Sequence, residues 1–142
     1  MVKQISVFIE NKKGRLAELA GLLSENRIDM KALSIADTTN FGILRCIVSD
    51  PDLAIKVIRD AGFTANVTEV LAVQVPDVPG GLAAILDYLA KADISVEYLY
   101  SFVRTNGDSA LILFRVEEPQ KAKDLLLSKN VPVLSAEQVD AL

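Results

Sequence analysis

The fold is decided by a short stretch that the chain contains twice, first as Glu10-Asn11-Lys12-Lys13-Gly14-Arg15-Leu16 and again as Pro76-Asp77-Val78-Pro79-Gly80-Gly81-Leu82. Each copy follows an apolar, strand-like run and precedes a run with the leucine spacing of a helix. Each is therefore predicted to be a tight polar turn between a strand and a helix. The first amides of a helix have no partner inside it, and a glycine beside them lets a ligand approach the backbone. We interpret both turns as sites for a small anion, namely the carboxylate of an amino acid.

The pattern around the turn recurs through the whole chain. Residues 2–67 read as strand-helix-strand-strand-helix-strand, and residues 71–134 repeat that order. A shift of 66 residues superposes Gly14 on Gly80, and after the hairpin a shift of 68 superposes Pro51 on Pro119. The longer second hairpin carries Asn106-Gly107, a pair typical of a tight β-turn. We therefore predict two domains, residues 1–68 and 69–142.

This element order predicts an α+β fold. Two ferredoxin-like βαββαβ units should lie side by side and form one continuous antiparallel sheet with the helices on one face. The second strand of each copy, residues 30–36 and 96–102, holds few charges. Because an apolar sheet edge left open promotes aggregation, we expect these two edges to pair with each other.

Composition excludes several classes of function. The net charge is −4 and the sequence pI is about 4.8, whereas nucleic-acid binding requires a basic face. The chain has no histidine and a single cysteine, so an internal disulfide is impossible and the commonest general base and metal ligand are missing. We expect no cofactor and no metal. No basic-then-apolar leader and no apolar run of about 20 residues is present, so we expect a cytoplasmic protein without membrane contact.

On these motifs the chain resembles a tandem ACT-domain protein over essentially its whole length. The resemblance is carried by the two turns, by Ile28-Asp29-Met30 and Ile94-Ser95-Val96, and by Phe41-Gly42-Ile43-Leu44-Arg45. It implies a regulatory protein of amino-acid metabolism that binds an amino acid between paired domains. Asn11 matches an asparagine that holds the ligand in the serine site of phosphoglycerate dehydrogenase. Asp29 and Ser95 stand where that site has a second ligand asparagine, supplied by the partner domain.

The expected site therefore combines two turns with two strand starts, and no catalytic residue is predicted. The ligand-binding residues are Asn11, Lys12, Lys13, Gly14, Arg15, Leu16, Asp29, Met30, Asp77, Val78, Pro79, Gly80, Gly81, Leu82, Ser95 and Val96. The expected partners are a small amino acid, a second copy of the chain in a homodimer, and a metabolic enzyme as the regulated protein.

Three functional classes remain open at this point. The chain is either a sensor, an interaction module that has lost its ligand and only builds oligomers, or a small ferredoxin-like enzyme. The lack of histidine, of a Gly-x-Ser-x-Gly elbow and of metal-spaced clusters argues against the enzyme.

Overall fold

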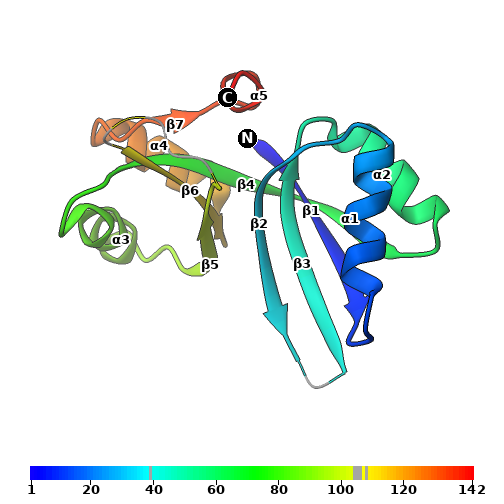
Figure 1. Ribbon diagram of the computed structural model, residues 1–142. Coiled ribbons are helices and arrows are strands. Elements are labelled where there is room, and N and C mark those ends of the chain that lie inside the picture. Colours follow the sequence, from blue (N-terminus) through cyan, green and yellow to red (C-terminus); the bar gives the residue numbers. More distant parts are fainter. Residues whose placement is uncertain (39, 104–106, 108) are drawn as a thin grey trace. The chain divides into compact units, whose positions relative to one another are not determined.

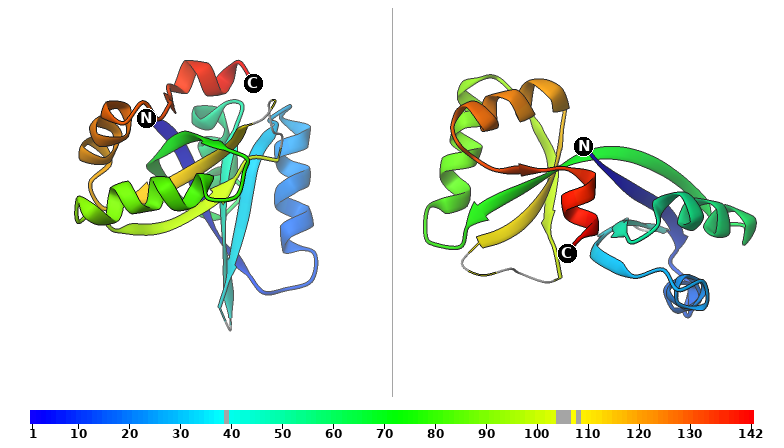
Figure 2. Two further views of the ribbon diagram at one scale, coloured as in Figure 1. Left: turned by 90° about the vertical axis from the view of Figure 1, so that its left-hand side faces the viewer. Right: turned by 90° about the horizontal axis from the view of Figure 1, so that it is seen from above.

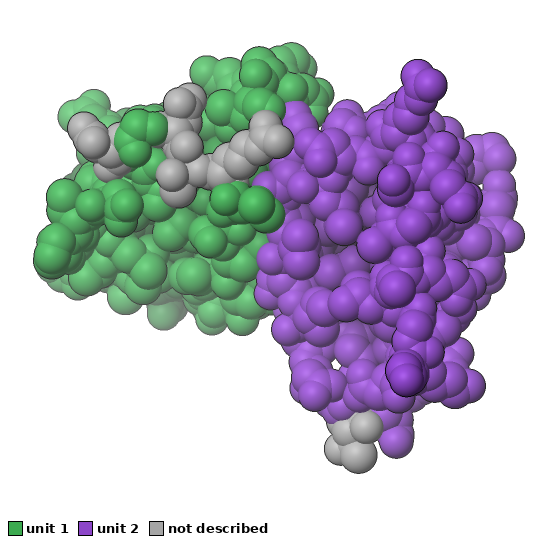
Figure 3. Space-filling model, viewed as in Figure 1, with its two compact units in different colours: residues 1–2, 69–142 green, residues 3–68 purple. Residues whose placement is uncertain are grey.

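A computed structural model describes residues 1–142 except Thr39, residues 104–106 and Asp108. The chain divides into two compact units (Figures 1 and 3). The N-terminal unit comprises residues 3–68, and the C-terminal unit comprises residues 1–2 and 69–142. Asn106 of the predicted hairpin turn lies outside the described residues.

The N-terminal unit follows the predicted order of elements. It contains β1 (Val2–Glu10), α1 (Arg15–Glu25), β2 (Met30–Asp37), β3 (Phe41–Val48), α2 (Pro51–Asp60) and the first part of β4 (Thr64–Pro76). The central strand is β3, which pairs antiparallel with β1 and with β2. Helix α2 begins at Pro51 because the Asp50 carboxylate accepts a hydrogen bond from the Leu53 amide at 3.1 Å.

The core of this unit lies between one face of the strands and helices α1 and α2, which pack against each other on that face (Figure 2). Alternate residues of β1, namely Ile5, Val7 and Ile9, are buried in this core, so one face of the strand packs against the helices. Each fully buried side chain of this size stabilises the fold by about 1.5–3 kcal/mol. In α1, Leu19 and Leu23 are buried in the same core, whereas Leu16 at the start of the helix is 43% exposed.

The C-terminal unit repeats the plan. It contains the rest of β4, α3 (Gly81–Lys91), β5 (Val96–Ser101), β6 (Ser109–Val116), α4 (Pro119–Ser128), β7 (Val133–Leu134) and α5 (Ala136–Asp140). Its strands pair antiparallel, β4 with β6 and β7, and β5 with β6. Buried side chains of β4, β6, α3 and α4 form a second core around Phe114. A capping box between Ser135 and Gln138 starts α5.

The predicted fold class is confirmed, but the predicted strand partners are wrong. The hydrogen-bonded order is β2-β3-β1-β4-β6-β5, so β2 and β5 end this path instead of pairing with each other. The reason lies in the junction between the repeats. Without a linker, the last strand of one repeat continues as the first strand of the next and forms the single strand β4. The hydrogen-bonded sheet therefore continues from one repeat into the next through β4.

Candidate functional site

The first turn joins β1 to α1 through a left-handed glycine. Gly14 has φ +88° and ψ −9°, a conformation that L side chains rarely adopt. Three backbone hydrogen bonds shape the turn. The Lys12 amide donates to the Glu10 carbonyl at 2.7 Å, Arg15 to Lys12 at 3.3 Å, and Glu18 to Gly14 at 2.9 Å.

The second turn, between β4 and α3, has the same geometry. Gly80 has φ +87° and ψ −9°. The three hydrogen bonds recur with a shift of 66 residues. They run from the Val78 amide to the Pro76 carbonyl at 2.9 Å, from Gly81 to Val78 at 3.0 Å, and from Ala84 to Gly80 at 3.0 Å. The equivalence of the turns, predicted from sequence, therefore holds for the glycine conformation and for these three hydrogen bonds.

Among the residues that the structure describes, both turns present amides without a protein acceptor. In the described part of the chain no acceptor is recorded for the amides of Leu16 and Ala17, nor for those of Leu82 and Ala83. Neither Gly14 nor Gly80 has a side chain to cap its helix. Such helix starts carry a partial positive charge and suit a carboxylate or phosphate.

Charged side chains at the first turn are mostly engaged with each other. The Lys12 ammonium lies 2.8 Å from the Glu10 carboxylate, and this hydrogen bond lowers the pKa of Glu10 below its ordinary value. Both side chains are well exposed. Exposed pairs of this kind contribute little stability, and Lys12 brings little net positive charge to the turn.

Asn11 binds the neighbouring hairpin. Its side-chain amide donates to the Asp37 carboxylate at 3.0 Å and to the Thr38 carbonyl at 2.8 Å. Its backbone amide donates to the Asn40 carbonyl at 3.2 Å. Asn11 thus ties the β2–β3 hairpin to the first turn.

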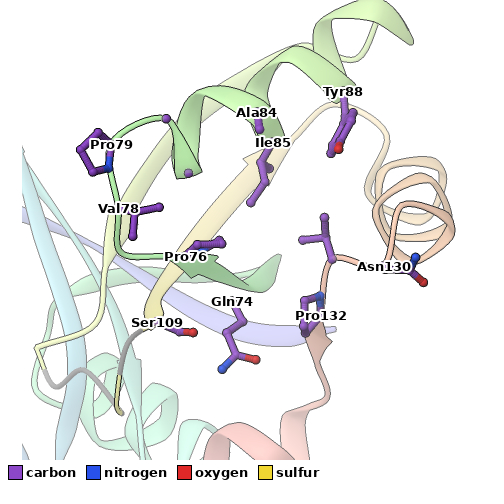
Figure 4. A pocket seen from close by; sticks show the side chains of 13 residues that line it. Gln74, Pro76, Val78, Pro79, Ala84, Ile85, Tyr88, Ser109, Asn130 and Pro132 are labelled. Carbon is purple, nitrogen blue, oxygen red and sulfur yellow. The ribbon is translucent and has the colours of Figure 1, made fainter.

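A pocket of about 590 Å³ adjoins the second turn and lies entirely within the C-terminal unit. In Figure 4, Ala84, Ile85 and Tyr88 border it from α3, Pro76 and Val78 from the end of β4 and the turn, and Pro132 from the segment before β7. The other lining residues are Gln74, Pro79, Gly80, Gly81, Ser109, Asn130 and Val131. The Asn130 amide points away from the rest (Figure 4).

Four of the predicted site residues line this pocket, namely Val78, Pro79, Gly80 and Gly81. Asp77 and Leu82 belong to the same turn but are not among the lining residues. Sequence reasoning missed the walls contributed by Tyr88, Ser109 and residues 130–132, because they lie outside the turn motif, in α3, at the start of β6 and in the segment between α4 and β7. The sequence did contain one signal, because the side chains at some pocket positions are smaller than those at the equivalent positions of the first repeat.

The predicted strand starts lie at the far end of their own units. Met30 pairs with Val48, whereas Glu10, just before the first turn, pairs with Phe41. These partners stand at the two ends of β3, about 23 Å apart at 3.3 Å per residue. The second repeat shows the same separation, with Val96 opposite Val116 and the end of β4 opposite Ser109. Asp29-Met30 and Ser95-Val96 therefore do not meet the turn of their own unit.

The described residues show no cluster of three or more histidine, cysteine, aspartate or glutamate side chains that could hold a metal. Burial raises the pKa of the Cys46 thiol to about 12, which leaves it protonated and a poor nucleophile. Among the described helices, none has the length and apolar character needed to span a bilayer.

Comparison with known proteins agrees with the fold. The sequence matches the family described as the ACT domain pair over residues 1–142. Protein BT0572 from Bacteroides thetaiotaomicron has a crystal structure that is 40% identical with a TM-score of 0.93, and the match covers 99% of this chain and 96% of that chain.

More distant structures share the fold. The ligand-free regulatory subunit of aspartate kinase from Thermus thermophilus is 14% identical with a TM-score of 0.67, over 90% of each chain. The corresponding subunit from Thermus flavus is 14% identical with a TM-score of 0.63, over 89% of this chain and 88% of that one. No match was found among curated proteins. Given two repeats with equivalent helix-start turns and a family match over the full length, this chain belongs to the ACT domain pair family.

Proposed function

We propose that the chain is a regulatory protein that binds a small amino acid and acts on an enzyme of amino-acid metabolism in the cytoplasm, without catalysing a reaction itself. ACT domain pairs are regulatory, and the fold is shared with subunits described as regulatory in aspartate kinase. The regulated enzyme is proposed to be a separate chain.

The observation that carries this proposal is the repeated turn. Two helix starts, with glycines at φ +88° and +87°, offer amides without a recorded protein acceptor. An amino-acid carboxylate can accept hydrogen bonds from such amides, and the local dipole favours its negative charge. Ligand binding at the turns needs no charged side chain and no catalytic group.

We propose that a second copy of the chain completes the sites. The strand starts Asp29-Met30 and Ser95-Val96 lie far from the turn of their own unit, so a homodimer offers them a route to a ligand. The strands of the N-terminal unit also expose apolar side chains on the face away from α1 and α2. On that face Phe8 is 42% exposed and Phe41 is 49% exposed. Apolar surface of this kind often marks a protein contact.

The function is tested by thermal-shift screening of the twenty common amino acids, followed by calorimetry on those that bind. A ligand present at 100 times its Kd should add about 2.7 kcal/mol of stability. The D-enantiomer of each chiral hit is the matched control. If no amino acid raises the melting temperature at millimolar concentration, the sensor function fails and the interaction module takes its place. Sedimentation that gives a monomer, with and without ligand, would refute the homodimer.

A further inference from the structure

The two repeats differ at one place beside the turn. In the N-terminal unit the Arg15 side chain runs from the start of α1 across the ring of Phe63, with its guanidinium carbon 4.2 Å from the ring centroid. One guanidinium nitrogen lies 2.9 Å from the Glu18 carboxylate. The Arg15 Nε is buried and donates no hydrogen bond within the described residues. The side chain therefore fills the space between the start of α1 and the segment that follows α2.

The equivalent positions in the C-terminal unit follow from the hydrogen bonds. The shift of 66 that relates the turns places Gly81 at the position of Arg15 and Ala84 at that of Glu18. After α2 and α4 the shift is 68. The Phe63 amide donates to the Ile58 carbonyl at 3.2 Å, and the Val131 amide donates to that of Leu126 at 2.9 Å. Val131 is thus the counterpart of Phe63.

All three counterparts line the pocket. Glycine, alanine and valine stand where the first repeat has arginine, glutamate and phenylalanine. A larger side chain at Gly81 is also excluded, because a Cβ there would lie 2.1 Å from the Pro76 carbonyl oxygen. The space that Arg15 fills in one unit is therefore open in the other and forms part of the pocket. The whole pocket, about 590 Å³, is within the size range of small-molecule sites.

The chemistry of the walls restricts the ligand. Gly80 and Gly81 bring the positive start of α3 to one end of the pocket. Ile85, Val131 and Pro132 supply apolar surface, and none of the thirteen lining residues is aspartate, glutamate, lysine or arginine. A charged side chain on the ligand would lose water there without gaining an opposite charge. A carboxylate has the helix start as its partner.

We propose that the second turn binds one small carboxylate ligand with an apolar side chain, such as an apolar amino acid, and that Arg15 closes the corresponding place at the first turn. This inference rests on the proposed function and narrows it, because it assigns one ligand per chain to the Gly80 turn.

The test is an NMR titration of the ¹⁵N-labelled full chain with L-leucine, L-phenylalanine, L-glutamate and L-arginine. The amide signals of Gly14 and Gly80 report the two turns separately. L-leucine or L-phenylalanine should shift Gly80 and its neighbours and leave Gly14 in place, with one ligand bound per chain by calorimetry. 4-Methylpentanoate, which lacks the ammonium group, distinguishes an amino-acid site from a general site for apolar carboxylates, and leucinamide, which lacks the carboxylate, should not bind.

Substitutions then locate the ligand. Ala84→Glu copies Glu18 and places a carboxylate at the pocket, at an exposed position in the first turn of α3 where a negative charge favours the helix. It should weaken binding about tenfold or more, since like charges are brought together. Ala83→Glu adds the same charge to the neighbouring exposed residue, which does not line the pocket, and Ala84→Gln adds the same length without charge. Both of these variants should bind L-leucine or L-phenylalanine more tightly than the Ala84→Glu variant does.

The outcomes separate the two proposals. Binding reported by Gly14, or preferred binding of L-glutamate or L-arginine, would overturn the pocket assignment while the sensor function stands. Equal affinity in Ala84→Glu and Ala83→Glu would do the same. Absence of binding by any amino acid would overturn the sensor function, and absence of binding by 4-methylpentanoate as well would also overturn the pocket assignment.

Discussion

Gly81→Ala provides a sharp test of how the second turn is built. Gly81 is the first residue of α3, and on helix propensity alone alanine should be better than glycine by about 0.8–1.0 kcal/mol. The structure predicts the opposite sign. A Cβ at Gly81 would lie 2.1 Å from the Pro76 carbonyl oxygen, whereas real Cβ contacts essentially never fall below 3.0 Å.

The magnitude follows from what must move. Relief of the contact requires a displacement of roughly 0.9 Å between two backbone segments, which is overpacking of the kind that costs about 1–3 kcal/mol. The Pro76 carbonyl also accepts the hydrogen bond from the Val78 amide that shapes the turn, so it cannot shift alone. We expect Gly81→Ala to lower the free energy of unfolding by about 1–3 kcal/mol.

Two other glycines serve as controls. Gly21 lies within α1 with open space around its Cβ position, so Gly21→Ala should stabilise the protein by about 0.8–1.0 kcal/mol. Gly80 also has open space but φ +87°, so Gly80→Ala should cost about 1–2 kcal/mol from backbone strain alone.

Urea unfolding followed by circular dichroism measures all three changes in the free energy of unfolding. In a thermal unfolding experiment, each kcal/mol should move the melting temperature by about 2–8 °C. A Gly81→Ala protein as stable as the wild type would refute the close approach of Pro76. A loss of stability in Gly21→Ala would refute the use of the helix scale as the reference.

Three further predictions concern the N-terminal unit. Burial raises the pKa of the Cys46 thiol to about 12. The contribution of this thiol to stability should therefore be complete below the ordinary thiol pKa of about 8.5 and should be lost as the pH rises towards 12. At pH 8, iodoacetamide should alkylate Cys46 only as fast as the protein unfolds, as measured by mass spectrometry. Asn11→Ala removes the hydrogen bonds to Asp37 and Thr38 and should cost about 0.5–1.5 kcal/mol for each, with faster amide exchange confined to the hairpin; unchanged exchange would contradict the role of Asn11. Arg15→Ala should cost about 0.5–1 kcal/mol and open the space at the first turn, so that L-leucine now also shifts the Gly14 amide; an unmoved Gly14 signal would show that Arg15 does not close a site.

Much of the fold was predictable because its causes are local. The alternation of Ile5, Val7 and Ile9 places one face of β1 in the core. Asp50 before Pro51 starts α2, and the glycines at 14 and 80 allow the left-handed turns. These features depend on residues within a few positions of each other. A similar local sequence in the second repeat therefore predicts the same strand, turn and helix as in the first.

The candidate site was less predictable, since its walls come from distant parts of the chain. The motif identified Gly80 and Gly81 but not Tyr88 or Val131. The resemblance points to Asn11 as a ligand residue, and in the structure its side-chain nitrogen donates to Asp37 and Thr38 of the β2–β3 hairpin. A hydrogen-bonding side chain in a turn has several partners within reach, and only the folded hairpin selects among them.

The sequence by itself determined the number of repeats, the order of their elements and the position of both helix-start turns, because periodicity and backbone preference act over a few residues. Only the tertiary structure decided that the strands join through β4, since apolar edges alone do not specify which edge pairs with which. It also decided which turn has an open pocket. Arg15 closes one turn by reaching Phe63, which lies far along the sequence, and the pair Gly81 and Val131 leaves the other open.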